Sequence, residues 1–274
     1  MSVLASRPAL KLLLFVWRRC STPIRGESSN ELLPRLGCHD SIGFDEAFAR
    51  PVAIDYSIHS SDLAFKLPQV LVPELNIEDY AAPVERSVAS DLFAESLFER
   101  LPEGSRVIAV HTDTKTEKMW TLPAWRELLA TLLEEDPNLY VMNVGLQQIE
   151  LTQPWLEERV FSLDGLSMAS TMAVVAKADL FIGIDSCFLH AADLCRVPGV
   201  GLFGPTDSHE FGFRFGPHRH VCGCGSLAAV GVGEVLEAVG ALRRAEPRTK
   251  GLRCASPMAA RISNPQRRGP IPPA

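Results

Sequence analysis

The stretch at residues 179–207 constrains the fold of this chain more than any other part of the sequence. Leu180–Ile184 is a short apolar run between two aspartates, which predicts a buried parallel strand. Phe188–Leu194 then has apolar residues at helical spacing, and Val200–Phe203 predicts a second strand after Pro198 has ended that helix. We therefore expect a strand–helix–strand unit whose two loops open at the same carboxyl edge of a sheet.

Polar residues fill both of these loops. Asp185 and Ser186 follow the first strand and are suited to cap the helix behind them, and the turn residues Gly204–Asp207 follow the second strand. Ligands of open α/β sheets bind at this edge, where a helix N-terminus offers unpaired N–H groups and a positive dipole end to an anion. Capping alone would also explain Asp185 and Ser186, but the second loop at the same edge favours a phosphate or pyrophosphate site.

Apolar patterns of strand and helix type alternate through residues 107–203 and predict a doubly wound parallel α/β sheet. Strands are expected at 107–111, 139–144, 160–163, 180–184 and 200–203, and helices at 125–133, 151–159, 167–177 and 188–194. Helical spacing also predicts helices at 83–100 and 230–242. Further upstream we expect a strand at 52–56, a polar turn that contains His59, and an extended segment that ends at Pro73.

Three loops of this predicted sheet resemble a known family. The segment Asp185-Ser-Cys-Phe-Leu-His190, followed by Phe203-Gly-Pro-Thr-Asp207, resembles the signature of the heptosyltransferase-like glycosyltransferases, family 9. That signature is an Asp-Thr-Gly-x-x-His segment before a Phe-Gly-Pro-Thr-Asp turn, so Cys187 stands where the family usually has glycine. Lys118-Met-Trp120 is similar to the family's Lys-x-Trp, in a loop where Thr112 and Asp113 replace its Pro-Gly.

The resemblance implies a GT-B-type Rossmann-like fold and the transfer of a sugar from a nucleotide diphosphate donor to an acceptor hydroxyl. The sugar would be a heptose and the donor ADP-linked, while the acceptor would be a glycan, a lipid-linked molecule or a small molecule. The reaction would need neither a cofactor nor a bound metal. The donor-binding residues that the resemblance implies are Lys118, Glu150, Asp185, Ser186, Cys187, Phe188 and His190.

These residues have separate roles in the resemblance. The loop after residue 184 would hold the diphosphate, and Lys118 would neutralise its charge, as a compact ammonium on a flexible stem can. Glu150 would accept the ribose hydroxyls, although a solvated glutamate at a helix start explains it equally well. His190 would either donate a hydrogen bond to the donor or brace the turn.

The resemblance covers about residues 100–245, and it divides the chain into three regions. Residues 1–100 would be a shortened, degenerate acceptor-side domain, 101–245 the Rossmann-like nucleotide-sugar domain, and 246–274 a disordered basic, proline-rich tail. In the family the catalytic base comes from the first turn of the amino-terminal domain, which is not visible in this sequence. The catalytic base is therefore unassigned. Four acidic residues of the amino-terminal region could be considered for it, and the sequence does not select among them: Asp40, Asp45, Asp55 and Asp62.

Two other functions stay open at this point. The chain could be a catalytically inactive protein that binds a nucleotide sugar or acts as a partner of a complete transferase, because the base is not visible. It could also be another enzyme that uses the same sheet edge, such as a nucleotide-sugar epimerase. A dehydrogenase is disfavoured because the sequence contains no dinucleotide fingerprint of glycines.

Composition excludes several classes of protein. The formal net charge of −6 argues against binding to nucleic acid, and seven scattered cysteines indicate reduced thiols in a soluble cytoplasmic protein. Leu12–Trp17 is too short an apolar run for a transmembrane segment of about 20 residues. A zinc site is conceivable because four ligand types alternate along one potential strand, but such residues rarely converge tetrahedrally, so we expect no metal. These four residues are His218, His220, Cys222 and Cys224.

Overall fold

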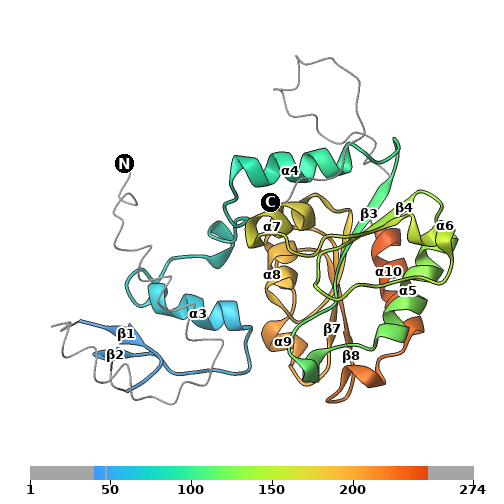
Figure 1. Cartoon of the computed structure of the whole chain (residues 1–274). Coiled ribbons are helices and arrows are strands. Elements are labelled where there is room, and N and C mark those ends of the chain that lie inside the picture. Colours follow the sequence, from blue (N-terminus) through green and yellow to red (C-terminus); the bar gives the residue numbers. More distant parts are fainter. Residues whose placement is uncertain (1–39, 47, 246–274) are drawn as a thin grey trace. The chain divides into compact units, whose positions relative to one another are not determined.

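The computed structural model describes residues 40–46 and 48–245, which fall into two compact units (Figure 1). Of the described residues, the first unit comprises 40–46 and 48–82 with His209–Phe211, and the second comprises Pro83–Ser208 with 212–245. The apolar run at residues 12–17 and the proposed tail at 246–274 lie outside the described residues.

The first unit contains a short parallel pair of strands, β1 (Ile42–Gly43) and β2 (Arg50–Pro51), followed by α3 (Ser60–Gln69) and the 3-10 turn η1 (Ile77–Asp79). The strand predicted at 52–56 is wrong: the pairing with β1 ends at Pro51, the Val52 N–H makes the last hydrogen bond to the Gly43 carbonyl at 2.7 Å, and residues 53–56 are not part of a strand.

The helix α3 replaces the extended segment that the sequence predicts before Pro73. Leu63 and Leu67 lie one helical turn apart and are both buried, which favours a helix over an extended chain. His59 is the residue before its first turn, and the His59 Nδ1 atom accepts a hydrogen bond from the Ser61 N–H at 3.2 Å. The proline at position 68, in the last turn, conceals the helical pattern.

The second unit is built on a six-stranded parallel sheet with the strand order β5-β4-β3-β6-β7-β8. Its strands are β3 (Arg106–His111), β4 (Leu139–Asn143), β5 (Val160–Ser162), β6 (Leu180–Ile184), β7 (Gly199–Phe203) and β8 (His218–Cys222). The five predicted strands are confirmed, and β8 adds a sixth at one edge of the sheet.

Helices cover both faces of this sheet, as a doubly wound fold requires. Figure 1 shows α5 and α10 on one face and α4, α7 and α8 on the other. The helices of this unit are α4 (Val88–Phe98), α5 (Leu122–Glu135), α6 (Pro154–Glu157), α7 (Met168–Lys177), α8 (Cys187–Leu194) and α10 (Val232–Ala245). Shorter elements are η2 (Thr116–Lys118), α9 (Ser208–Phe211), which the unit boundary crosses, and η3 (Leu227–Ala229). The helix predicted at 151–159 is confined to the short α6, which begins at a proline.

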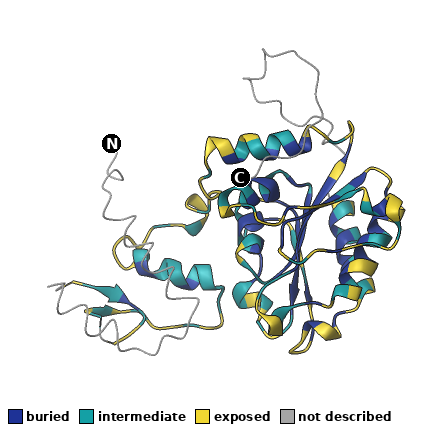
Figure 2. Ribbon diagram, viewed as in Figure 1, coloured by how far each residue is buried: buried dark blue, intermediate teal, exposed yellow. Residues whose placement is uncertain are grey.

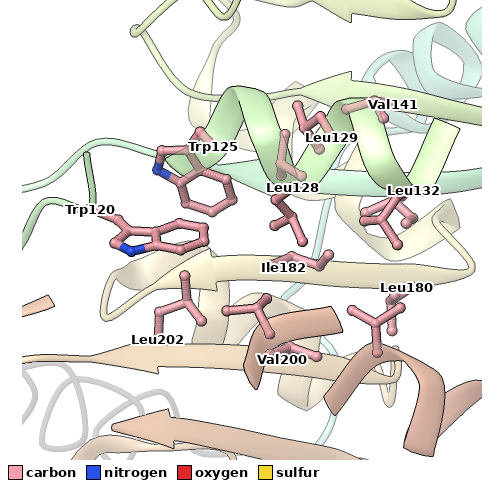
Figure 3. Close-up of a cluster of buried hydrophobic side chains, with 14 of the residues drawn as sticks. Trp120, Trp125, Leu128, Leu129, Leu132, Val141, Leu180, Ile182, Val200 and Leu202 are labelled. Atoms are coloured by element: carbon pink, nitrogen blue, oxygen red, sulfur yellow. The ribbon is translucent and has the colours of Figure 1, made fainter. Parts of the chain in front are cut away.

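Apolar residues at alternate positions of the central strands pack against the helices on one face of the sheet to form the main core cluster. Leu180, Ile182, Val200 and Leu202 pack beneath α5, whose inward face carries leucines (Figure 3). At one end of this cluster the rings of Trp120 and Trp125 meet edge to face, with their centroids 5.1 Å apart. Figure 2 shows that the central strands are buried while the outer sides of the covering helices are not, so burial on both faces explains why β6 and β7 are uniformly apolar.

Candidate functional site

The strands β3, β6 and β7 lie side by side, and the loops that carry the predicted motifs leave their carboxyl ends together. β3 ends at His111, β6 is followed by Asp185 and Ser186, and β7 is followed by the turn at 204–207. In a parallel sheet these three ends share one edge, so the structure brings the separate motifs to a common location.

An ion pair joins two of the predicted donor-binding residues. The Lys118 Nζ atom, at the end of η2, lies 2.5 Å from the Asp185 Oδ2 atom. The side chains are only 23% and 11% exposed, respectively, so water screens the pair less than it would at the surface. Asp185 therefore fixes the position of the Lys118 ammonium at the end of β6, which is more than the helix-capping role that its sequence position alone suggests.

Ser186 stands at the N-cap position of α8 but makes no side-chain hydrogen bond to that helix. Its Oγ atom is buried and has no hydrogen-bond partner within the described ranges of the chain. A hydroxyl in this state costs roughly 1–3 kcal/mol relative to a paired one. Such a cost at a helix N-terminus on the ligand-binding edge of the sheet indicates a functional role for Ser186.

Two further polar atoms at this edge are buried and have no hydrogen-bond partner among the residues that the structure describes, namely His111 Nδ1 and Thr206 Oγ1. Desolvation lowers the pKa of His111, and the nearby Asp113 carboxylate opposes this shift only in part. The His111 imidazole is therefore neutral at pH 7, and each of its nitrogens can donate or accept a hydrogen bond according to tautomer. Neither residue is among the donor-binding residues predicted from the sequence, although Thr206 belongs to the Phe-Gly-Pro-Thr-Asp turn.

The remaining predicted residues of α8 lie in its first turn. Phe188 packs against His111, with ring centroids 4.7 Å apart, which ties this turn to the end of β3. Cys187 is exposed, and desolvation of its thiol raises the pKa above the ordinary value of 9.0, so the thiol is protonated at neutral pH. His190 is half-buried on the same helix.

Glu150 stands apart from this cluster. It is exposed in the loop after β4, and neither a hydrogen bond nor an ion pair joins it to another of the described residues. Its carboxylate is free to accept hydrogen bonds from a ligand, as the ribose-binding role requires. The structure does not place it in contact with Lys118 or Asp185.

Two of the acidic residues of the first unit are engaged in ion pairs. Asp40 pairs with Arg50, and Asp55 pairs with Lys66 at 3.3 Å. Hydrogen bonds from Ser57 lower the pKa of Asp55, with a further contribution from Lys66. A lowered pKa makes Asp55 a weaker proton acceptor, which disfavours it as a general base.

The two histidines of β8 make contacts within the fold, and Cys222 and Cys224 are exposed. His220 Nε2 accepts a hydrogen bond from the Phe213 N–H at 2.9 Å, and the His218 and His220 rings stack with centroids 4.6 Å apart. Among residues 40–46 and 48–245 no group of three or more His, Cys, Asp or Glu side chains is arranged to hold a metal ion. Within the same residues, none of the helices has the length and hydrophobicity needed to cross a membrane.

Comparison with known proteins assigns the family. The family model described as Glycosyltransferase family 9 (heptosyltransferase) matches residues 32–227. This chain belongs to glycosyltransferase family 9. The match includes every predicted donor-binding residue and parts of both units, so it confirms the resemblance that the loop motifs indicated.

Relatives of this family 9 chain include lipopolysaccharide heptosyltransferase 1 of Escherichia coli K12, which is 23% identical over 133 residues. That match covers 47% of this chain but only 41% of the relative, so the chain aligns with less than half of that protein.

Solved structures share the fold at low sequence identity. A family 9 glycosyltransferase from Veillonella parvula has a TM-score of 0.65 at 14% identity, covering 78% of this chain and 70% of that one. The ADP-heptose lipopolysaccharide heptosyltransferase II of Escherichia coli has a TM-score of 0.57 at 13% identity, covering 78% and 72% of the two chains. The GT-B-type Rossmann-like parallel sheet that the sequence predicts is confirmed.

Proposed function

We propose that this family 9 chain binds a nucleotide-diphosphate sugar at the carboxyl edge of β3, β6 and β7 and transfers the sugar to an acceptor hydroxyl. The observation that carries the proposal is the Lys118–Asp185 ion pair, at the same sheet edge as buried polar atoms of Ser186 and Thr206 that have no partner within the described residues. Together they form a cation and two hydroxyl groups at the edge where α/β sheets bind phosphates.

Lys118 would act on the leaving group of this transfer. Negative charge grows on the diphosphate as the bond to the sugar breaks, and a preorganised cation stabilises that charge more in the transition state than in the ground state. Asp185 holds the ammonium in place, and the N–H groups at the start of α8 add further donors. With these groups to stabilise the negative charge of the leaving diphosphate, the proposed transfer requires no bound metal.

The hydroxyls and the neutral imidazole at the same edge would complete the diphosphate site. Ser186 and Thr206 can each donate an O–H to a phosphate oxygen, and His111 can donate an N–H, so a bound diphosphate would satisfy all three buried atoms. The backbone of Cys187 and Phe188 belongs to the same turn, and His190 lies one turn further along α8. Glu150 would accept the ribose hydroxyls from the neighbouring loop.

The names of the relatives suggest which ligands to test first. They are a lipopolysaccharide heptosyltransferase and an ADP-heptose heptosyltransferase, so we propose ADP-heptose as the donor and a glycan, a lipid-linked sugar or a small molecule as the acceptor. A carboxylate would activate the acceptor hydroxyl, and we assign that base to no residue. We also propose a cytoplasmic location, in keeping with the seven scattered cysteines.

The alternative is a protein that binds the donor without transferring it. Cys187 favours this alternative, because a side chain at the position where the family usually has glycine narrows the approach to the backbone of the turn. The two functions differ in turnover, so ADP release from ADP-heptose should be measured in the presence of candidate acceptors, for the wild type and for Lys118→Ala. Release that depends on acceptor and on Lys118 supports the transferase; donor binding without transfer or hydrolysis establishes the inactive binder.

A further inference from the structure

Asp113 binds a loop of the neighbouring strand. It lies two residues beyond the end of β3, and its Oδ1 atom accepts a hydrogen bond from the Leu146 N–H at 2.7 Å and a weaker one from the Gln147 N–H at 3.5 Å. Successive N–H groups that point to one oxygen form an anion-binding nest, and here the anion is a side chain of the same protein. Asp113 therefore links the loop after β3 to the loop after β4.

Gly145 is required for this contact. A Cβ atom at position 145 would lie 2.0 Å from the Asp113 Oδ1 atom and 2.9 Å from the Thr112 Oγ1 atom, both too close for a real contact. On the other side of the turn, Asn143 Oδ1 accepts the Gly145 N–H at 3.2 Å and Asn143 Nδ2 donates to the Gln147 carbonyl at 2.7 Å. Side chains from β4 and from the end of β3 thus hold the turn from both sides.

The far end of the same loop is also fixed. Ile149 is 1% exposed and belongs to the apolar cluster beneath α5, and the Leu151 N–H donates to the Glu157 carboxylate at 2.6 Å. Between these two anchored residues lies Glu150, whose side chain is exposed. The loop is thus held at two places, by Asp113 at residues 146 and 147 and by the buried Ile149 and the paired Leu151 on either side of Glu150.

We propose that Asp113 is a positioning residue that fixes the loop at 145–150 so that Glu150 meets the ribose of the donor. This role rests on the proposed function, since it assigns Glu150 to the nucleotide. Asp113 itself does not contact the ligand; it preorganises a loop that otherwise has to be ordered when the nucleotide binds. The Asp113 carboxylate accepts a hydrogen bond from the Leu146 N–H, and this interaction explains how a negative charge is accommodated near a diphosphate site.

The test compares ADP affinity by titration calorimetry in the wild type, Asp113→Ala, Glu150→Ala and the double variant. If the loop is competent in about a tenth of the Asp113→Ala molecules, the apparent affinity for ADP falls about tenfold. Because Asp113 acts through Glu150, the double variant should be no weaker than the weaker single variant. Wild-type affinity in Asp113→Ala, or losses that multiply in the double variant, would overturn the proposal.

A control ligand, pyrophosphate, and a control variant, Asp113→Asn, distinguish the proposed role from a general loss of structure. Pyrophosphate has no ribose, so its affinity should stay within about twofold of the wild type in Asp113→Ala, and equal loss of both ligands contradicts a role through Glu150. If Asp113→Ala does not fold, Asp113→Asn replaces it in the test, because asparagine keeps an oxygen acceptor for the Leu146 N–H but lacks the charge. We expect its affinity for ADP to lie between those of the wild type and Glu150→Ala. Wild-type affinity for ADP in a variant whose Leu146 amide is unprotected from hydrogen exchange would contradict the proposal. A wild type that binds neither ligand contradicts the proposed function and this role with it, whereas wild-type binding that Asp113→Ala leaves unchanged contradicts this role alone.

Discussion

Single residues at the starts of neighbouring helices show how the site differs from the rest of the fold. Ser167 and Ser186 occupy the same N-cap position before α7 and α8. The Ser167 Oγ atom accepts the Ser170 N–H at 3.1 Å, whereas the Ser186 Oγ atom is buried without a partner among the described residues. The first hydroxyl stabilises its helix, and the second is available to a ligand.

This contrast gives a matched pair of substitutions. Ser167→Ala should lower the free energy of unfolding by about 1 kcal/mol and leave ADP affinity unchanged, because it removes a cap. Ser186→Ala should not lower the free energy of unfolding and should raise it by up to about 1–3 kcal/mol, because it removes a buried hydroxyl without a protein partner, and it should weaken ADP binding. Urea unfolding and calorimetric titration measure the two effects, and the reverse pattern would show that Ser186 is merely a helix cap.

His111 predicts how stability depends on pH. Burial lowers its pKa below the ordinary value of 6.5, so between these two values the unfolded chain binds a proton that the folded protein does not. The free energy of unfolding should therefore fall as the pH drops below 6.5, by up to about 1.4 kcal/mol per pH unit for this one group. Urea unfolding at pH 7.5 and pH 5.5 should show a smaller difference in His111→Gln than in the wild type; an equal difference would mean that His111 titrates normally.

At the scale of elements, Asp193 joins α8 to the segment that leads into β8. Its side chain is 3% exposed and accepts hydrogen bonds from three consecutive backbone N–H groups, those of Arg214, Phe215 and Gly216, at 2.9, 2.8 and 2.7 Å. The edge strand β8 is thereby held beside β7, and the helix that begins at the candidate site is fixed at its other end.

Removal of this carboxylate should weaken the second unit. Asp193→Ala removes the carboxylate acceptor of three buried or partly buried N–H groups and should lower the free energy of unfolding by roughly 2–4 kcal/mol, measured by urea unfolding. Asp164→Ala, which removes an exposed aspartate from a loop, is the control and should change stability by less than about 0.5 kcal/mol. Similar values for the two variants would contradict the structural role of Asp193.

Elements with a strong local pattern could be predicted from the sequence, and others could not. β6 is predicted with its observed bounds because an uninterrupted apolar run reports burial on both faces. β8 is not predicted as a strand of the sheet because its residues, His218–Cys222, are largely polar. As the edge strand it forms backbone hydrogen bonds with one neighbour only, β7. α3 was missed because its buried leucines are few and a proline lies in its last turn.

The same distinction holds for the whole molecule and its candidate site. Asp185, Ser186 and Lys118 were identified because each lies in a motif, but the ion pair between two of them joins residues 67 positions apart and depends on the order of strands. Whether a buried polar atom has a partner is also a property of the tertiary structure, so the motif that contains Thr206 could not show that its hydroxyl is unpartnered, and no motif singled out His111. Sequence motifs thus identify the loops, and the fold determines which atoms in them are available to a ligand.

Titration of the full chain with ADP, without added metal, tests the central claim most directly. The wild type should bind ADP saturably, and Lys118→Ala should weaken binding by about 1–3 kcal/mol because a charge-assisted contact to the diphosphate is lost. Lys115→Ala is the matched control, since Lys115 is an exposed lysine of the same loop, and it should bind as the wild type does. A folded wild type that does not bind ADP at millimolar concentration, or equal affinity in Lys118→Ala, would contradict the assignment of this edge of the sheet as a nucleotide-diphosphate site.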